Sequence, residues 1–404
     1  MSATTSPCEG RGVRPILTAP SLADITAAAR AIRGKAIRTP LVRLNLPSHT
    51  GRQARDEPEI YLKLESLQPI QSFKVRPAAN TLASIKDKAA LRRVGVCTAS
   101  AGNFAQGLAW CCQEAGIQCT VVAPGHAPAA KLAEIRRRGA TVVTVPFEEW
   151  WRVIETHQCP QAPGGAQFIH PGAEAAVLAG NATIALEILD DLPDVDCIVV
   201  PYGSGAVCTG VACGVRAAAG ATSKGVRSAC RVLACEPATA APFAASKRRG
   251  VPTTFDEYTP SFVDGCGGKG VLREVWSLAN QVVDGGLAVP VPAIANAVKL
   301  LAERNKVIVE GAGACPVAAA VGGMCGPARK IVCVVTGGGI DTSALVHILQ
   351  DRGVPPPSTP TAAPAPFLHK AAASSGSAGW WCAAGMVGGL CVGLALATLA
   401  RRRV

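Results

Sequence analysis

Residues 119–145 read CTVVAPGHAPAAKLAEIRRRGATVVTV, and this stretch decides the fold class. Two short apolar runs, at 119–122 and 141–145, flank a predicted helix at 129–138. Apolar runs of this length on both sides of a helix are typical of parallel strands that are buried on both faces. The stretch therefore predicts a strand, a helix and a strand of an α/β domain.

The same alternation continues outward from this unit in both directions. We expect further strands at 60–64, 94–97, 197–200, 232–235 and 331–335, and further helices at 22–32, 104–115, 176–189, after Gly205 and at 293–304. The sequence shows no internal repeat. Together these elements predict parallel sheets covered by helices on both faces.

Composition excludes several classes of protein. The chain has 404 residues, of which 49% are hydrophobic and 17% charged, so it can bury a large core and is not a disordered chain. Its 42 glycines and 30 prolines follow no three-residue period, which excludes collagen. The net charge of +12 comes from short, scattered basic runs, and aromatic residues make up only 4%. We therefore expect no nucleic-acid partner.

The cysteines and histidines show no metal-ligand spacing. The 17 cysteines form no CxxC pair, and the six histidines are dispersed along the chain. This usage favours free thiols in a reducing compartment over a disulfide framework.

The C-terminal end departs from the α/β pattern. Residues 351–379 are rich in proline, alanine and serine, which predicts a linker. Residues 380–400 carry no charge, and three arginines follow them. A helix over 380–400 would span roughly 31 Å at about 1.5 Å per residue, the thickness of a bilayer's hydrocarbon core. A buried core helix is the alternative; we expect a single-pass membrane anchor with the rest of the chain on the cytosolic side.

Three segments place polar groups or glycines where we expect strands to end, which is where parallel sheets bind ligands. In the first, Lys74 stands between Phe73 and Val75. Apolar neighbours can desolvate an amine, lower its pKa and favour a nucleophile, although most such lysines only extend their ammonium to water.

The other two segments open predicted helices. Residues 98–104, TASAGNF, bring small residues to a helix N-terminus that can bind a carboxylate; an ordinary N-cap by Ser100 or Asn103 is the alternative. Residues 203–207, GSGAV, form a glycine-rich turn that can hold a phosphate, or a plain tight turn.

Six motifs in order carry a family resemblance. They are LESLQPIQSFKVRPA, TASAGNFAQGLA, HPGAEAAVLAGNATIALEIL, VPYGSGAVCTG, VEGAGA and VVTGGGID, and they lie across about residues 20–350. Together they resemble the threonine/serine dehydratases of pyridoxal-phosphate fold type II, the tryptophan synthase β-like fold, a group that includes serine racemase. The resemblance implies two parallel-sheet domains with the cofactor between them. We expect a large domain at 21–94 and 166–350 and a small domain at 95–165, after a disordered segment at 1–20.

The resemblance also implies roles for individual residues. Lys74 would hold pyridoxal 5′-phosphate through its amine, with Phe73 beside the ring. Asn103 would bind the ring hydroxyl, Thr336 would contact the pyridine nitrogen, and Gly265 would pack over the ring face. The substrate carboxylate would be bound by Ser100, Ala101 and Gly102, and the cofactor phosphate by Gly203, Ser204, Gly205, Ala206 and Val207.

The implied reaction is a β-elimination that converts L-threonine or L-serine to a 2-oxo acid and ammonia. Racemisation requires a proton donor on the face of the ring opposite Lys74, and in the racemases this is a serine before the Gly-Asn pair. Ala101 occupies that position and cannot transfer a proton. The alternatives are a serine racemase-like enzyme and a catalytically weak, membrane-tethered protein. Threonine, serine and 3-hydroxyaspartate all remain candidate substrates, and we expect a homodimer.

Several positions depart from the family pattern. Pro77 replaces a glycine and has no N–H to donate, Ala206 adds a methyl group to the phosphate turn, and Phe104 replaces a histidine. Glu236 resembles the carboxylate of the family's cation site, but Pro242 stands where metal-dependent members have an aspartate. We therefore expect no dependence on a divalent cation, whereas a monovalent cation held by carbonyl oxygens is compatible with the sequence.

Overall fold

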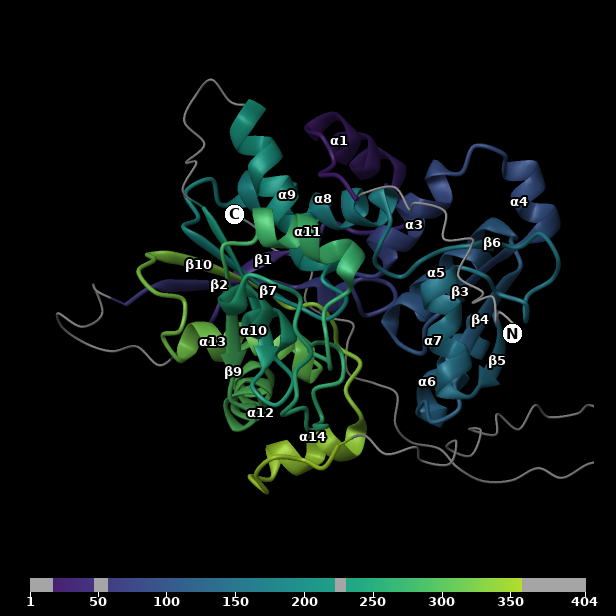
Figure 1. Cartoon of the computed structure of the whole chain (residues 1–404). Coiled ribbons are helices and arrows are strands. Elements are labelled where there is room, and N and C mark those ends of the chain that lie inside the picture. The colour runs from purple at the N-terminus through teal and green to yellow at the C-terminus, as the bar shows by residue number, and fades with distance from the viewer. Residues whose placement is uncertain (1–16, 47–56, 222–229, 358–404) are drawn as a thin grey trace, which may run out of the picture. The chain divides into compact units, whose positions relative to one another are not determined.

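The computed structural model describes residues 17–46, 57–221 and 230–357 (Figure 1). The first described residue, Leu17, is partly buried against two apolar clusters, so ordered chain starts before the predicted domain start at residue 21. The predicted anchor at 380–400, most of the predicted linker and residues 1–16 lie outside the described ranges. Within those ranges, no helix is both long and apolar enough to cross a membrane.

The larger sheet has six strands in the order β1-β2-β10-β7-β8-β9. The neighbouring pairs β2 and β10, β10 and β7, β7 and β8, and β8 and β9 are all parallel, as the sequence predicts. The edge strand β1 is the exception, because Leu41 pairs with Lys63 in antiparallel register. The strand bounds are β1 Leu41–Arg43, β2 Glu59–Lys63, β7 Cys197–Pro201, β8 Arg231–Pro237, β9 Gly285–Val289 and β10 Lys330–Val334.

The smaller sheet contains the stretch that decided the fold class. Its four strands are parallel and run in the order β5-β4-β3-β6. Strands β4, Cys119–Pro124, and β5, Thr141–Val145, flank helix α6, Ala129–Arg137, which confirms the predicted strand, helix and strand. Strand β3 covers Val96–Ala99 and β6 covers Gln167–Phe168. Helices α5, α6 and α7 contact these strands (Figure 1).

Further helices, among them α5 and α7 beside the smaller sheet, complete the fold. Their bounds are α1 Leu22–Ala31, α3 Val75–Ser84, α4 Lys88–Val94, α5 Asn103–Ala115, α7 Phe147–Thr156, α8 Ala175–Asp191, α9 Ala206–Ala221, α10 Pro242–Arg249, α11 Arg273–Val282, α12 Val291–Leu300, α13 Gly311–Val321 and α14 Thr342–Leu349. A 3₁₀ turn covers Glu65–Leu67, and a π-helical turn covers Leu301–Asn305.

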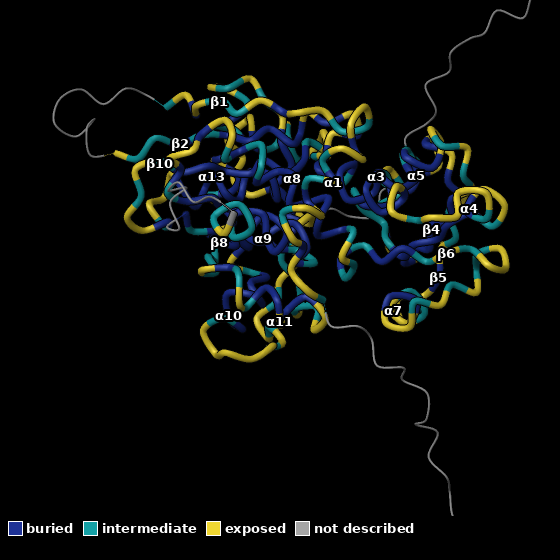
Figure 2. Tube along the Cα trace, turned by 90° about the horizontal axis from the view of Figure 1, so that it is seen from above, coloured by how far each residue is buried: buried dark blue, intermediate teal, exposed yellow. Residues whose placement is uncertain are grey.

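Strand β7 shows why the larger sheet needs helices on both faces. Cys197 and Val199 belong to the apolar cluster that includes residues of α12 and α13. Ile198 and Val200 belong to the cluster built with residues of α8, α9 and α11. Successive strand residues point to opposite faces, so an uninterrupted apolar run buries both of them. Figure 2 shows this burial as dark blue tube along α8, α9 and α13.

Helix α3 packs against helix α8 at very short range. A Cβ atom at Gly180 of α8 would lie 2.8 Å from the Cα of Pro77 and 2.9 Å from the carbonyl oxygen of Arg76. Pro77 is the third residue of α3, where a backbone N–H has no acceptor within the helix. The missing N–H of Pro77 therefore leaves the helix intact.

Candidate active site

Lys74 immediately precedes helix α3, in a turn that is fixed to the end of strand β10. The Phe73 N–H donates to the carbonyl oxygen of Thr336 at 3.1 Å, and Ser72 forms an isolated bridge with Gly337. The lysine does not directly follow a strand, as the sequence suggested, because the 3₁₀ turn at 65–67 intervenes. Nevertheless the turn reaches a strand end, since residues 336–337 follow β10 after the single residue Val335.

The Lys74 amine lies between aromatic rings. Its Nζ is 4.8 Å from the ring centroid of Phe73 and 5.6 Å from that of Phe104. Burial lowers the pKa of Lys74 to about 8, and the nearby carboxylate of Glu310 opposes this shift. This confirms the predicted desolvation and makes the amine a nucleophile near neutral pH.

A buried network of charges holds the same chain segment from the other side. Arg76 Nε and Nη2 donate to the two oxygens of Glu65, each at 2.7 Å. Arg76 also bonds Glu187 of α8 at 2.7 Å, and Lys63 bonds Glu187 at 2.6 Å. The Thr39 hydroxyl donates to Glu65 at 2.6 Å. The network joins β2, the 3₁₀ turn, α3 and α8 around the lysine turn.

Ser100, Ala101 and Gly102 form the turn between β3 and α5. The N-cap of α5 is Gly102, and no side chain caps the helix, so the interpretation of an N-cap by Ser100 or Asn103 is wrong. The Gly102 N–H donates to Ser100 Oγ at 3.3 Å. The first turn of α5 therefore offers backbone donors that no cap occupies, which is what a bound carboxylate requires.

The glycine-rich turn at 203–207 leads into helix α9 and contains a glycine in the left-handed conformation. Gly205 has a φ of +86°, and a Cβ atom there would lie 2.5 Å from the Tyr202 Oη. A Cβ atom at Gly203 would lie 3.1 Å from the carbonyl oxygen of Gly265, so the predicted ring-facing glycine is next to the predicted phosphate turn. Helix α9 begins at Ala206 and directs its N-terminus to this turn, and the Ala206 methyl is buried in an apolar cluster.

Thr336 supplies a buried hydroxyl without a partner. The residue is 3% exposed, and its Oγ1 has no hydrogen-bond partner in the part of the chain that the structure describes. A buried hydroxyl of this kind costs stability unless a ligand satisfies it. A ring nitrogen of a bound cofactor would do so.

Glu310 is a site residue that the sequence interpretation missed. It is 6% exposed and accepts hydrogen bonds from Asn103 Nδ2 at 3.0 and 3.3 Å. Burial raises the pKa of Glu310, Asp264 adds to this effect, and Lys131 opposes it. The motif VEGAGA contains this glutamate, so the signal was present, but its contact with Asn103 joins residues 207 positions apart.

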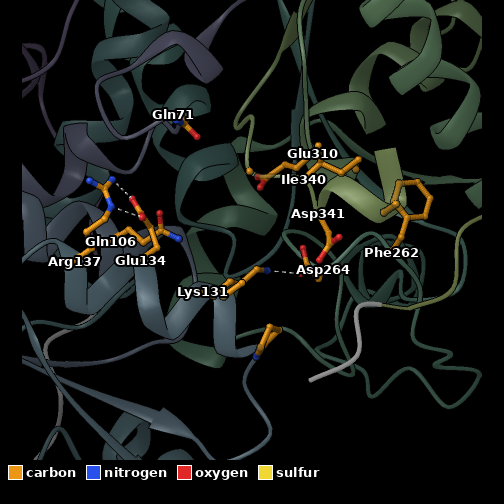
Figure 3. A pocket seen from close by; sticks show the side chains of 15 residues that line it. Gln71, Gln106, Lys131, Glu134, Arg137, Phe262, Asp264, Glu310, Ile340 and Asp341 are labelled. Atoms are coloured by element: carbon orange, nitrogen blue, oxygen red, sulfur yellow. Dashed lines mark hydrogen bonds and ion pairs between the residues drawn. The ribbon is translucent and has the colours of Figure 1, made fainter. Parts of the chain in front are cut away.

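A cleft of about 310 Å³ opens beside these residues (Figure 3). Glu310 lines it, together with Gln71 from the lysine turn and Gln106 from α5. Lys131 of α6 forms an ion pair with Asp264 at its mouth. This pair connects a helix of the smaller sheet with the loop that carries Gly265.

Glu236 serves a helix N-terminus. It is fully buried, and its oxygens accept hydrogen bonds from the N–H groups of Phe243, at 3.1 Å, and Ala244, at 2.9 Å. These residues belong to α10, which begins at Pro242. Burial raises the pKa of Glu236 to about 8. No group of three His, Cys, Asp or Glu side chains that could hold a metal ion occurs among residues 17–46, 57–221 and 230–357.

Comparisons with known proteins agree with this geometry. A family model described as pyridoxal-phosphate dependent enzyme matches residues 32–337. An L-threonine ammonia-lyase of Thermotoga maritima is 36% identical over 82% of this chain and 78% of its own length. The catabolic L-threonine dehydratase TdcB of Escherichia coli is 34% identical over 80% of this chain and 94% of its own length. The structure of maize serine racemase matches 83% of this chain and 98% of its own chain, with a TM-score of 0.70 and 29% identity.

The residues of the site fit the cofactor that this family is named for. The desolvated amine of Lys74 can bond an aldehyde, the turn at 203–207 can hold a phosphate, and the Thr336 hydroxyl can satisfy a ring nitrogen. These groups meet at the ends of β7 and β10 in the larger sheet. The chain belongs to the pyridoxal-phosphate-dependent enzymes of fold type II, and its cofactor is pyridoxal 5′-phosphate.

Proposed function

We propose that this enzyme is an L-threonine/L-serine ammonia-lyase, which eliminates the β-hydroxyl group and releases a 2-oxo acid and ammonia. The desolvated amine of Lys74 beside the glycine-rich turn carries the proposal. The names of the Thermotoga maritima and Escherichia coli relatives support L-threonine as the substrate. Bound pyridoxal phosphate supplies the sink for the electrons released at the substrate's Cα.

The chain's own residues then have distinct tasks. The N–H groups at the start of α5 and the turn at 100–102 bind the substrate carboxylate and set its orientation. Lys74 takes the Cα proton, and a pKa of about 8 leaves a useful fraction of neutral amine at neutral pH. Asn103, whose side chain is held by Glu310, would bind the hydroxyl group of the cofactor ring and so orient that ring. Thr336 would offer the ring nitrogen of the cofactor a hydroxyl group, which, unlike a carboxylate, would not hold a proton there.

A panel of hydroxy amino acids tests this function. We expect the cofactor-loaded protein to form a 2-oxo acid and ammonia in equal amounts from L-threonine and L-serine, and to form neither from L-alanine, which has no leaving group. Cofactor binding without turnover of any member of the panel would contradict the proposal.

Elimination should exceed racemisation because Ala101 provides no proton donor. We expect pyruvate formation from L-serine to exceed D-serine formation by at least about tenfold, since a positioned acid or base contributes roughly 10²-fold or more to a proton transfer. Chiral chromatography and a pyruvate assay on the same reaction measure both products. D-serine in excess of pyruvate would favour the racemase alternative.

We also propose that residues 380–400 anchor the enzyme in a membrane, with the catalytic part in the cytosol. The uncharged stretch, the tryptophans at its start and the arginines after it support the proposal. Deleting residues 380–404 should move the protein from the membrane fraction to the soluble fraction. A full-length protein that is already soluble would contradict the anchor.

Finally, we propose a homodimer that needs no divalent cation. The two backbone N–H donors on Glu236, and Pro242 at the start of α10, support the second part. EDTA should leave the elimination rate within about twofold, because the Glu236 oxygens already serve as hydrogen-bond acceptors in a helix cap. Light scattering of the cofactor-loaded protein gives the oligomeric state.

A further inference from the structure

We propose that the cleft lined by Gln71, Gln106 and Glu310 selects against substrates with a side-chain carboxylate, so that L-threonine and L-serine are preferred to 3-hydroxyaspartate. This inference rests on the proposed function, because it takes the same site as the place of elimination. It adds a class of substrate that the enzyme excludes.

Acidic side chains outnumber basic ones around the mouth of the cleft. The Lys131 ammonium forms an ion pair with Asp264, and it also acts electrostatically on Asp341 and Glu310. All four residues line the cleft, and Figure 3 shows Asp264 and Asp341 near the end of the Lys131 side chain. Burial raises the pKa of Glu310, so the charge balance rests on Asp264 and Asp341: one ammonium group faces these two carboxylates, and an incoming carboxylate meets net negative charge.

The second cation of the cleft is already paired. Arg137 donates from Nε and Nη2 to the two oxygens of Glu134, each at 2.7 Å. A bidentate pair leaves little positive charge for a ligand. The neighbouring Gln71 and Gln106 are neutral, so within the described lining neither Lys131 nor Arg137 is an uncommitted cation.

The cleft adjoins the turn that is proposed to bind the substrate carboxylate. Glu310, in its wall, contacts Asn103, which directly follows the carboxylate-binding turn. Gln106 is on the same helix α5, one turn after that asparagine. An uncompensated charge about 6–10 Å away at high effective dielectric constant changes binding by roughly two- to tenfold.

L-Asparagine and L-aspartate form a matched pair for the test, since they differ mainly in charge and neither carries a β-hydroxyl group. We expect the cofactor-loaded full chain to bind L-asparagine at least about fivefold more tightly than L-aspartate at low ionic strength, measured by the change in cofactor absorbance. Salt should reduce this ratio, because ions screen the exposed carboxylates. In parallel, kcat/KM for L-threonine should exceed that for L-threo-3-hydroxyaspartate.

Two variants test the origin of the preference. Asp341 is the N-cap of α14, so Asp341→Asn removes its charge and keeps a capping side chain. Asp264→Asn removes a carboxylate and frees Lys131. We expect the ratio to fall about two- to fivefold in Asp341→Asn and further in Asp264→Asn. The matched control is Asp87→Asn, because Asp87 is the exposed N-cap of α4 and does not line the cleft.

The outcomes separate this inference from the proposed function. Equal binding of L-aspartate and L-asparagine to the wild-type protein, no binding of either, or a ratio that neither cleft variant changes would overturn the inference. A ratio that behaves as expected while no hydroxy amino acid is eliminated would support the charge selection and contradict the ammonia-lyase function.

Discussion

The charges on the two sides of the lysine turn are arranged in opposite ways. In the network behind the turn, Arg76, Glu65 and Glu187 each have a counter-charge within 2.9 Å. At the front, Lys74 contacts aromatic rings, and Glu310 has an amide donor in place of a cation. Each region combines buried residues with one that is half-buried, Glu187 behind the turn and Lys74 in front, so the two regions differ mainly in how their charges are paired.

The pKa values follow this difference. Burial alone would raise the pKa of Glu65, but Arg76 and the Thr39 hydroxyl outweigh it and hold the pKa below its usual range. For Lys74, burial prevails and lowers the pKa to about 8, and for Glu310 it prevails and raises the pKa. Paired charges hold the structure together, whereas charges left short of partners keep the chemistry available.

The largest expected effect is on the unpaired side. Lys74→Ala should abolish the visible absorbance of the bound cofactor and lower elimination by roughly a thousandfold or more, because it removes both the anchor and the proton acceptor. Absorbance spectra and a 2-oxo acid assay measure the two effects. The control Lys86→Ala alters an exposed lysine near the end of α3 and should change neither. Normal turnover by Lys74→Ala would show that this lysine is not needed for the reaction, and the front of the turn would no longer differ in function from the charge network behind it.

Breaking the paired side should cost stability. Arg76→Met leaves the Glu65 carboxylate buried without its cation and should lower the free energy of unfolding by about 3–5 kcal/mol. Arg137→Met removes a cation whose side chain is 70% exposed and should cost less than about 1 kcal/mol. Urea denaturation measures both. Equal losses of unfolding free energy in the two variants would mean that burial does not increase the contribution of the Arg76 network to stability.

Lys74→Met should stabilise the cofactor-free protein, the reverse of the Arg76 result. The pKa of Lys74 is about 8 in the folded state and about 10.5 in the unfolded chain, so the unfolded state binds the extra proton between these values. The lysine therefore costs most below pH 8, and the cost disappears as the pH rises toward 10.5. We expect a gain of about 1–3 kcal/mol at pH 7 and little at pH 10.5. A gain in unfolding free energy that does not change with pH would contradict the lowered pKa of Lys74.

The smallest expected effect is the change in the Lys74 pKa when the charge of Glu310 is removed. The Glu310 carboxylate raises the pKa of the lysine against the effect of burial, so Glu310→Gln should move that pKa further down. The pH dependence of cofactor uptake, followed by absorbance, measures the shift. Glu148→Gln on the exposed face of α7 is the control and should leave the profile unchanged. An unchanged pKa would show that Glu310 is neutral at the pH of the measurement, and an upward shift would contradict the prediction.

The sequence predicts the parallel frame well, because apolar runs such as 119–122 and 141–145 report burial locally. It does not predict β1, since three residues at a sheet edge carry no period. Helix α3 was also missed, because Pro77 resembles a helix breaker although it lies in the first turn. The Lys74 pKa followed from its neighbours in sequence, whereas the Arg76–Glu187 contact joins residues 111 positions apart and has no local signal.

Gly180 is the feature with the widest consequence. Its Cα lies so close to the backbone of Arg76 and Pro77 that no side chain fits between the two helices. The lysine turn is thus positioned from behind by this backbone contact as well as by the ion pairs of Arg76. Any side chain at position 180 would have to push helix α3, and with it the lysine turn, away from helix α8.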